Sequence, residues 1–435
     1  MDYAATTPVL PEVFRLMKPY FGDKFGNPGS LYDLGRVARV AIREAREKIA
    51  KVLGCKSDEL FFTSSATEAN NLVILGLARA NKEFGKRIII SNVEHKATFS
   101  ACEALKEEGF EIIKIPVGED GIIILDEFKK ALTPGTILVS VTMADSETGT
   151  IQPIAKIAKI ISDFGNRQLT TYNTQPITDR KPIFHIDASQ GALYQNIGVE
   201  YLGADLLTLS SHKIGGPKGV AGLFIKRGTK IRPIIYGGGQ QRNIRSGTEN
   251  VPAIVGFGEA VSLCGKNKKE EAERIKGLRD KLEKGIFEKI PKAILNGHKE
   301  NRLPNFLNVS FLDIEGEALL LYLDNLGISV STGSACDSES LEPSYILQAL
   351  GRSYEFIHGS IRFSLGKANT ESDIDYTLKH LPVVVEKLRK ISPLNLKMGE
   401  KKEISEPKAF LGGKTPHFLR KSEIRSTKSE TNEAK

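Results

Sequence analysis

The chain has 435 residues, a net charge of +8, 40% apolar and 26% charged residues, a composition typical of a soluble globular protein with a sizeable core. Its length predicts a large domain accompanied by a smaller one. No apolar run reaches the roughly 20 residues of a membrane span, and the first residues lack the basic start and apolar stretch of a signal peptide, so we expect a cytoplasmic protein with no membrane partner.

Apolar, β-branched runs alternate with helical patterns through the first 260 residues. Amphipathic spacing predicts helices such as 66–80 and 97–109. Continuous apolar strands separated by helices are typical of a mostly parallel sheet covered on both faces, so the sequence predicts an α/β fold. The predicted strands are 59–64, 87–92, 136–141, 183–189, 205–210 and 222–226.

The chain after Phe257 has a different character. A long charged helix is predicted over residues 266–290, and the shorter strands and helices that follow, up to about Ile391, predict a smaller α+β domain. We therefore expect a large domain over residues 12–258. Residues 1–11 and 259–396 are expected to form the small domain.

Two segments stand apart from this pattern. Residues 165–181 are polar and aperiodic, and we expect an insertion there that is functional or disordered. Residues 397–435 carry ten Lys or Arg against six Glu and few apolar residues, which predicts a disordered basic tail. Because the other basic residues do not gather with interleaved aromatics, we expect no direct binding to nucleic acid.

Two charged residues follow the ends of neighbouring predicted strands. Asp187 ends the apolar run of the strand predicted at 183–189, and Lys213 follows the strand at 205–210 within SSHKIGGPKG. Ligands of parallel α/β sheets collect at the carboxyl ends of the strands. Pyridoxal phosphate needs a carboxylate on its pyridinium nitrogen and a lysine that forms a Schiff base with it. The alternative is a surface lysine in a loop rich in glycine and proline, and Asp187 makes it the weaker reading.

Other candidates are ambiguous when taken alone. Ser65 and Glu68 have capping-box spacing at a helix start that suits a phosphate, although a simple capped helix is the favoured reading. His95, in NVEHKA, is either an ordinary core or surface histidine or an imidazole stacked on a cofactor ring. The helix start at Ser65 and the histidine His95 are both expected at the same sheet edge as Asp187.

The four cysteines are far apart and have no metal-ligand spacing, so we expect neither a disulfide framework nor a metal. Cys102 and Cys264 lie in predicted helices, where a small buried residue is the default, and Cys55 ends a helix with nothing nearby to activate it. Cys336 lies in the small, polar stretch STGSACDSES, which predicts a reactive thiol on an exposed loop.

The motifs, taken together and in order, resemble those of the NifS/IscS-type cysteine desulfurases, which belong to the class V aminotransferase group. This resemblance runs from Asp2 to about Leu396 and implies the fold of fold-type I pyridoxal phosphate enzymes. The motifs that carry it are DYAATTPV, FGNPGSLYDLG, FFTSSATEANN, VEHKA, HIDASQ, SSHKIGGPKG, GGGQQRNIRSGTEN, STGSACDSESLEPSYILQALG and SIRFSLG.

The resemblance implies a role for each residue around the cofactor ring. Lys213 would hold pyridoxal phosphate covalently, His95 would stack on the ring, and Asp187 would contact the pyridinium nitrogen. Gln190 would approach the ring hydroxyl. Ser146, in DSETG, stands where the family usually has an asparagine near that hydroxyl, so we expect altered cofactor tuning and an unchanged class of reaction.

The resemblance also assigns the phosphate, the substrate and the sulfur. Arg362, in SIRFSLG, would clamp the carboxylate of L-cysteine, and Cys336 would take its sulfur as a persulfide and release alanine. Cys336 could also serve as a transient iron–sulfur ligand together with a scaffold partner. The phosphate would be bound by Ala66, Thr67, Ser210, His212 and Thr248, the last from the second subunit of a homodimer.

The implied partner is a sulfur-acceptor protein, either an iron–sulfur scaffold or a tRNA-thiolating enzyme. Two alternatives stay open: another class V enzyme such as a selenocysteine lyase or an aminotransferase, and a non-catalytic scaffold that binds partners through its tail. The first needs no loop thiol, and the second needs neither Lys213 nor Asp187.

Ser65 and Ser211 replace glycines of the family motifs, and the start close to DYAATTPV suggests a missing or displaced first strand.

Overall fold

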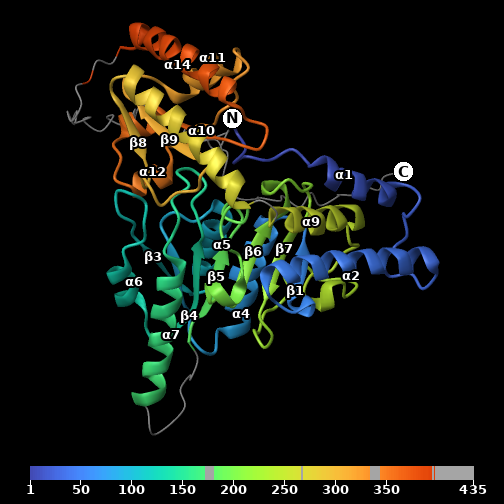
Figure 1. Cartoon of the computed structure of the whole chain (residues 1–435). Helices are drawn as coiled ribbons and strands as arrows, with labels where there is room; N and C mark the ends of the chain where they lie inside the picture. Colours follow the sequence, from blue (N-terminus) through green and yellow to red (C-terminus); the bar gives the residue numbers. More distant parts are fainter. Residues whose placement is uncertain (172–180, 266–267, 334–342, 394–395, 397–435) are drawn as a thin grey trace, which may run out of the picture. The chain divides into compact units, whose positions relative to one another are not determined.

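The computed structural model describes residues 1–171, 181–265, 268–333, 343–393 and 396 (Figure 1). By their contacts, Met1–Leu396 form one unit, and the predicted tail at 397–435 lies outside the described residues. Two β-sheets lie within Met1–Leu396, as the sequence suggests. The boundaries proposed between a large and a small domain stay a prediction.

The larger sheet has seven strands, and each of its neighbouring pairs except those of β7 is parallel. The strand β7 runs antiparallel to both of its neighbours, so the other six strands point the same way. The predicted mostly parallel α/β fold is therefore confirmed. In sheet order, the strands are β1 (Leu60–Thr63), β7 (Ala221–Ile225), β6 (Leu206–Ser210), β5 (Ile183–Asp187), β4 (Thr136–Thr142), β2 (Arg87–Ser91) and β3 (Glu111–Ile115).

Helices cover both faces of this sheet. The predicted helix at 66–80 is a continuous run over residues 66–81 with one π-helical turn in its middle. The helices are α1 (Pro11–Met17), α2 (Asp33–Leu53), α3 (Ala66–Asn71), η3 (Leu72–Leu77), α4 (Ala78–Asn81), α5 (Lys96–Glu107), α6 (Leu125–Ala131), α7 (Ile154–Thr171), α8 (Val199–Leu202) and α9 (Val251–Cys264). Short 3-10 turns add η1 (Lys18–Phe21), η2 (Ser57–Glu59), η4 (Ser211–Lys213) and η5 (Gln241–Asn243).

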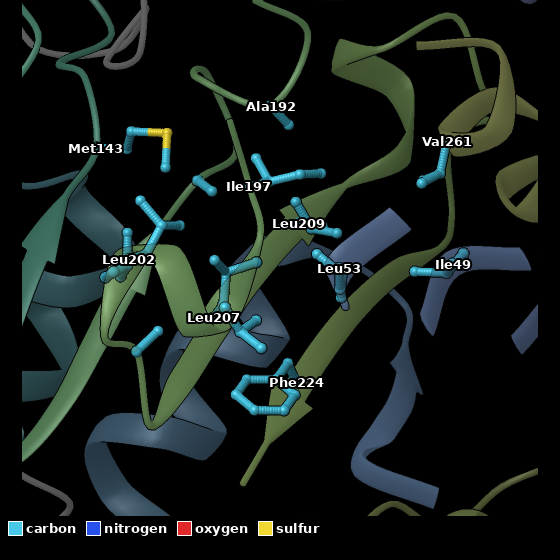
Figure 2. Close-up of a cluster of buried hydrophobic side chains, with 14 of the residues drawn as sticks. Ile49, Leu53, Met143, Ala192, Ile197, Leu202, Leu207, Leu209, Phe224 and Val261 are labelled. Carbon is cyan, nitrogen blue, oxygen red and sulfur yellow. The ribbon is translucent and has the colours of Figure 1, made fainter. Parts of the chain in front are cut away.

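The strands alternate their side chains between two apolar layers. On β6, Leu207 and Leu209 enter a cluster that includes residues of α2, α7 and α9, whereas Leu206 enters a second cluster with η3 and α5. Figure 2 shows part of the first cluster, where Leu207 lies beside Phe224, its neighbour on β7. Because both faces are buried, every residue of β6 is buried, and its sequence reads as a nearly continuous apolar run.

The smaller sheet has three antiparallel strands in the order β10–β9–β8, with its own apolar cluster. Its strands are β8 (Ala293–Asn296), β9 (Phe306–Phe311) and β10 (Ser360–Ser364). The accompanying helices are α10 (Lys268–Lys289), α11 (Gly316–Asp324), α12 (Tyr345–Ala349), α13 (Tyr354–His358) and α14 (Glu371–Ile391). Within the described ranges, no helix combines the length and the apolar character needed to cross a membrane.

The expectation of an aperiodic connection from residue 165 is wrong in its first part, because α7 continues through Thr171, whereas the insertion itself stays a prediction. A glycine inside a helix lowers the stability of the helix by only about 1 kcal/mol relative to alanine. At Gly165 the absence of a side chain also leaves room for a neighbouring segment. A Cβ there would lie 2.8 Å from the Cβ of Lys181, which precedes β5. Residues 172–180 of the predicted insertion lie outside the described residues.

The N-terminal segment connects the two sheets. Tyr3 donates its N–H to the carbonyl of Ser364 on β10 at 3.1 Å. Further along, Thr7 donates to the carbonyl of His212 and Leu10 to that of Gly215, each at 2.9 Å. Residues 3–10 therefore run from the edge of the small sheet to the loop that carries Lys213.

Candidate active site

Most of the site residues predicted from the sequence follow strands of the large sheet, at one edge of that sheet. Because β1, β2, β4, β5 and β6 are mutually parallel, the segments that follow them leave the same edge. Asp187 is the last residue of β5, Ser210 is the last residue of β6, and Lys213 ends the η4 turn that follows. His95 caps the helix after β2, and Ser146 follows β4.

Asp187 is buried, with 5% of its surface exposed. Its Oδ2 accepts a 2.7 Å hydrogen bond from the side-chain amide of Asn70, and its Oδ1 accepts one from the N–H of Ser189 at 2.9 Å. Both donors are neutral, so they orient the carboxylate without cancelling its charge. The sequence reasoning missed Asn70, although a buried polar residue one turn into the predicted helix at 66–80 was the available signal.

Lys213 and Gln190 converge on the same backbone carbonyl. The ammonium group of Lys213 donates to the carbonyl oxygens of Ala4 and Ala5, the latter at 3.0 Å, and Gln190 Nε2 donates to that of Ala4 at 3.2 Å. Gln190 lies three residues after Asp187. The loops that follow β5 and β6 therefore meet at the N-terminal segment, and Lys213 and Asp187 come from the same edge of the sheet.

The loop of Lys213 depends on its glycines for packing. Gly215 has φ +81°, which favours glycine, and a Cβ on it would lie 2.7 Å from Leu10. A Cβ on Gly216 would clash with the hydroxyl of Ser211. These glycines therefore allow the N-terminal segment and η4 to pack closely. The serines that replace family glycines are unstrained, since Ser65 is extended at φ −162° and Ser211 has no positive φ.

His95 experiences the charges of both Asp187 and Lys213. Burial lowers the pKa of its imidazole, Asp187 opposes that shift, and Lys213 and Lys96 add to it. More than a third of the His95 surface is nevertheless exposed, so protein surrounds the ring without covering it. Its Nδ1 accepts a 3.1 Å hydrogen bond from the N–H of Ala97, which leaves the proton of the neutral ring on Nε2.

The residues predicted to bind phosphate come from three segments. Ala66 and Thr67 start the helix that Ser65 caps, and Ser65 Oγ accepts the N–H of Glu68 at 3.1 Å. The first amides of a helix have no intrahelical acceptor and attract anions. Ser210 is buried. Burial and the nearby Lys213 lower the pKa of His212 to about 4, so that ring is a neutral hydrogen-bonding group.

Thr248 is exposed. Three residues before it, Arg245 Nε donates to Glu68 at 2.9 Å, which ties the Thr248 loop to the first turn of α3. The loop is also held by Gln241, whose side-chain oxygen accepts the N–H of Phe62 at 2.9 Å. Whether Thr248 acts from a second subunit stays a prediction, since the structure contains one chain.

Arg362 approaches this edge from the small sheet. It lies on β10 with 6% of its surface exposed, and its Nη1 donates to the backbone carbonyl of Ser146 at 2.7 Å. Its Nη2 donates to Asp2 Oδ1 at 2.9 Å, and its buried Nε has no hydrogen-bond partner among the described residues. Ser146 therefore contributes its backbone to this contact. Asp2 was not singled out from the sequence, because nothing local marks it as a partner of Arg362.

Cys336 lies outside the described residues. The three cysteines that the structure does describe have poorly reactive thiols: burial raises the pKa of Cys55, Cys102 and Cys264 to about 12 in each case. A nucleophilic thiol must ionise near neutral pH. Each of these three cysteines therefore fits the structural role that the sequence predicts for Cys102 and Cys264.

Two buried carboxyls near the site, Glu94 and Glu147, are not marked by any pattern in the sequence. Glu94 accepts from Ser91 Oγ at 2.5 Å and from the N–H of Thr142 at 2.9 Å, and its Oε2 has no described partner. Glu147 accepts from Ser344 Oγ at 2.5 Å. Burial raises the pKa of each carboxyl to about 8, so both are mainly protonated at neutral pH.

We expect Glu94→Gln to flatten the pH dependence of stability. Because the folded-state pKa of Glu94 is raised to about 8, the folded state keeps a proton that the unfolded state loses above its ordinary pKa. The wild-type free energy of unfolding should therefore fall between pH 5 and pH 8, by up to about 1.4 kcal/mol per pH unit for each such group. Urea unfolding across this range measures the slope, with the exposed Glu12→Gln as a control. Equal slopes in wild type and Glu94→Gln would contradict the prediction.

Comparison with known proteins agrees with this arrangement. Residues 1–377 match the aminotransferase class-V family. A protein named cysteine desulfurase IscS from Dictyoglomus turgidum is 48% identical over 90% of this chain and 96% of its own length. A protein of the same name from Methanosarcina thermophila is 46% identical over 91% of this chain and 94% of its own.

Solved structures give the same result. A NifS-like protein covers 89% of this chain and 99% of its own with 36% identity and a TM-score of 0.81. The structure of SspA in complex with cysteine covers 84% of this chain and 97% of its own, with 32% identity and a TM-score of 0.71. The sequence, the topology of both sheets and the strand-end residues agree, and the chain belongs to the class-V aminotransferase family, in its IscS/NifS group of cysteine desulfurases.

Proposed function

We propose that this chain is a pyridoxal phosphate-dependent cysteine desulfurase, which takes sulfur from L-cysteine, releases L-alanine and carries the sulfur on Cys336 as a persulfide. The observation that carries the proposal is the convergence of Lys213, Asp187 and His95 at one edge of the sheet, with Arg362 entering from the second sheet. An amine, an acid, an imidazole and a guanidinium together suit an amino-acid substrate held against an aromatic cofactor.

The residues present fit pyridoxal phosphate. Asp187 is a buried carboxylate that neutral donors orient, so its charge is available for a cationic ring nitrogen. Ala66 and Thr67 lie in the first turn of α3, whose amides have no acceptor within the helix and suit a phosphate. When bound, the cofactor supplies an electron sink for the substrate Cα. Gln190, next to the Lys213 amine at the Ala4 carbonyl, would contact the ring hydroxyl, and Ser146 offers that group a shorter side chain than asparagine would.

The other site residues divide the work on the substrate. Lys213 would hold the cofactor covalently, and its amine would then move protons at the substrate Cα. His95, neutral because its pKa is lowered, suits stacking on the cationic ring because it adds no second positive charge, and it keeps a proton on Nε2. Arg362 would bind the substrate carboxylate, since a guanidinium and a carboxylate pair through two parallel hydrogen bonds.

Cys336 would take the sulfur. Its thiolate attacks the sulfur atom of the substrate, an S–S bond forms, and the C–S bond breaks with its electron pair left on carbon, which a proton then converts to alanine. Two observations support this assignment. The described cysteines have thiol pKa values raised to about 12, and the segment of Cys336 is rich in small and polar residues.

The partners and location belong to the same proposal. Five large apolar side chains within residues 14–32 are more than half exposed, which suits an interface with a second copy of the chain. Such a homodimer would bring Thr248 to the partner's phosphate site. The persulfide would pass to an iron–sulfur scaffold or a tRNA-thiolating enzyme, and a cytoplasmic location suits a reactive thiol that must stay reduced. The exposed side chains are Phe14, Phe21, Phe25, Leu31 and Tyr32.

The test is a direct assay of the purified, cofactor-loaded protein. With L-cysteine and a thiol reductant, it should release L-alanine and sulfide in equal amounts, and it should sediment as a dimer. L-selenocysteine and α-keto acids with an amino donor serve as comparison substrates for a lyase and an aminotransferase. Turnover of either comparison substrate without alanine from L-cysteine would contradict the proposal.

A further inference from the structure

The guanidinium of Arg362 already holds a carboxylate from its own chain. Asp2 Oδ1 accepts from Arg362 Nη2 at 2.9 Å, and the two side chains are 21% and 7% exposed respectively. Nη1 is bound to the carbonyl of Ser146. A substrate carboxylate that comes to this guanidinium therefore meets an anion that is already in place.

Asp2 is fixed in that position from several sides. Its Oδ2 accepts from Ser331 Oγ at 3.0 Å, and Ser364 Oγ lies 3.4 Å from its Oδ1. Its backbone forms a parallel bridge with Ser364 on β10, the strand that also carries Arg362. Displacing this carboxylate would break several hydrogen bonds at once, so we expect Asp2 to stay beside Arg362 when a ligand binds.

Glu147, a buried acid near Arg362, does not add a second negative charge beside the guanidinium at neutral pH. Glu147 lies close enough to Arg362 to be affected by its charge, but burial raises the pKa of that carboxyl to about 8. It is therefore mainly neutral at pH 7, whereas Asp2 forms the ion pair. In a buried setting, like charges on one guanidinium repel more strongly than they would in water.

We propose that Asp2 is an internal counter-anion that sets the affinity of this site for the substrate carboxylate. The inference rests on the proposed function, which assigns Arg362 to that carboxylate. Asp2 balances the buried cation while the site is free and opposes a second carboxylate when a substrate arrives. It is thus a specificity-determining residue: it weakens the binding of carboxylates and makes additional negative charge on a ligand unfavourable.

The experiment compares two ligands that differ only at the carboxylate, L-alanine and L-alaninamide. In cofactor-loaded Asp2→Asn, which keeps the shape and the acceptor oxygen, the dissociation constant of L-alanine should fall about tenfold, equal to ~1.4 kcal/mol. The dissociation constant of L-alaninamide should change less than about twofold. Calorimetric titration measures both, and thermal stabilisation by L-alanine should be larger in the variant because Arg362 has lost its own counter-charge.

A matched control removes the same charge elsewhere. Glu371 lies on α14 with a 78% exposed side chain beside Lys281, and Glu371→Gln should bind both ligands as wild type does. If Asp2→Asn fails to fold, Ser331→Ala loosens Asp2 more gently and should tighten L-alanine about twofold. Unchanged or weaker binding of L-alanine by a folded variant would overturn the assignment of Asp2. Absence of alanine and sulfide from the wild type would instead overturn the proposed function.

Discussion

Lys213→Ala should lower the rate of alanine formation from L-cysteine by at least about 10³-fold, because it removes both the covalent anchor and a general base. The amine of Lys213 points toward the carbonyls of Ala4 and Ala5, which Gln190 also approaches, and alanine leaves those contacts empty. The fold should survive, since Lys213 is only half-buried on a short turn. Asp187 and the start of α3 should still bind the cofactor, but without a covalent bond.

A labelling experiment and a control variant distinguish loss of the Lys213 amine from a general loss of folded protein. Borohydride reduction followed by peptide mass analysis should find the cofactor on Lys213 in the wild type and on no lysine in Lys213→Ala. Lys218→Ala removes an exposed lysine from the same loop and should keep wild-type activity and labelling. Retention of alanine formation within about tenfold of wild type in Lys213→Ala would contradict the assigned role.

Much of the large sheet could be predicted because its strands are buried on both faces. Most residues of β5 and β6 enter one of two apolar layers, and the buried polar pair His185 and Thr208 bond to each other at 3.0 Å, so runs such as LLTLS can be recognised from the sequence alone. The strand β3 was missed for the opposite reason. It lies at the edge of the sheet, and its first four residues are exposed or only partly buried, so EIIKI reads as a mixed segment.

Ligands of parallel sheets collect at the carboxyl ends of the strands, and this rule alone predicts Asp187, Lys213 and His95 at one edge. It could not find Asn70, Glu94 or Asp2, because their importance lies in contacts between distant segments. The Asp2–Arg362 pair joins residues 360 positions apart, and the Asn70–Asp187 bond spans 117. No periodicity in the sequence reports contacts of this kind.

The end of helix α7 shows a different limit of prediction from the sequence. Gly165 and the polar residues after it predict the end of a helix, yet α7 continues through Thr171, with Gly165 packed closely against Lys181. That contact depends on how the chain returns to β5, which local composition does not encode. That residues 165–181 are an insertion with a function or in disorder stays a prediction.

Cys336→Ser should abolish persulfide formation and lower alanine release by at least about 10³-fold, equal to ~4 kcal/mol of activation free energy. A serine hydroxyl has a similar size, but it is a far weaker nucleophile toward sulfur than a thiolate. Because Lys213, Asp187 and His95 are untouched, the variant should keep the visible absorbance of the bound cofactor. It should also keep the spectral change that L-cysteine produces, since the substrate can still enter the site.

The other cysteines supply the control that makes this result specific. Cys55 is a half-buried thiol at the end of α2, and burial raises its pKa to about 12, so Cys55→Ser should form persulfide as the wild type does. Radiolabelled L-[³⁵S]cysteine followed by non-reducing electrophoresis detects the protein-bound sulfur in each variant. A label that persists in Cys336→Ser and disappears in Cys55→Ser would move the nucleophile to the other residue. Equal alanine release by Cys336→Ser and wild type would mean that carbon–sulfur cleavage needs no protein thiol, and the chain would then act as a lyase.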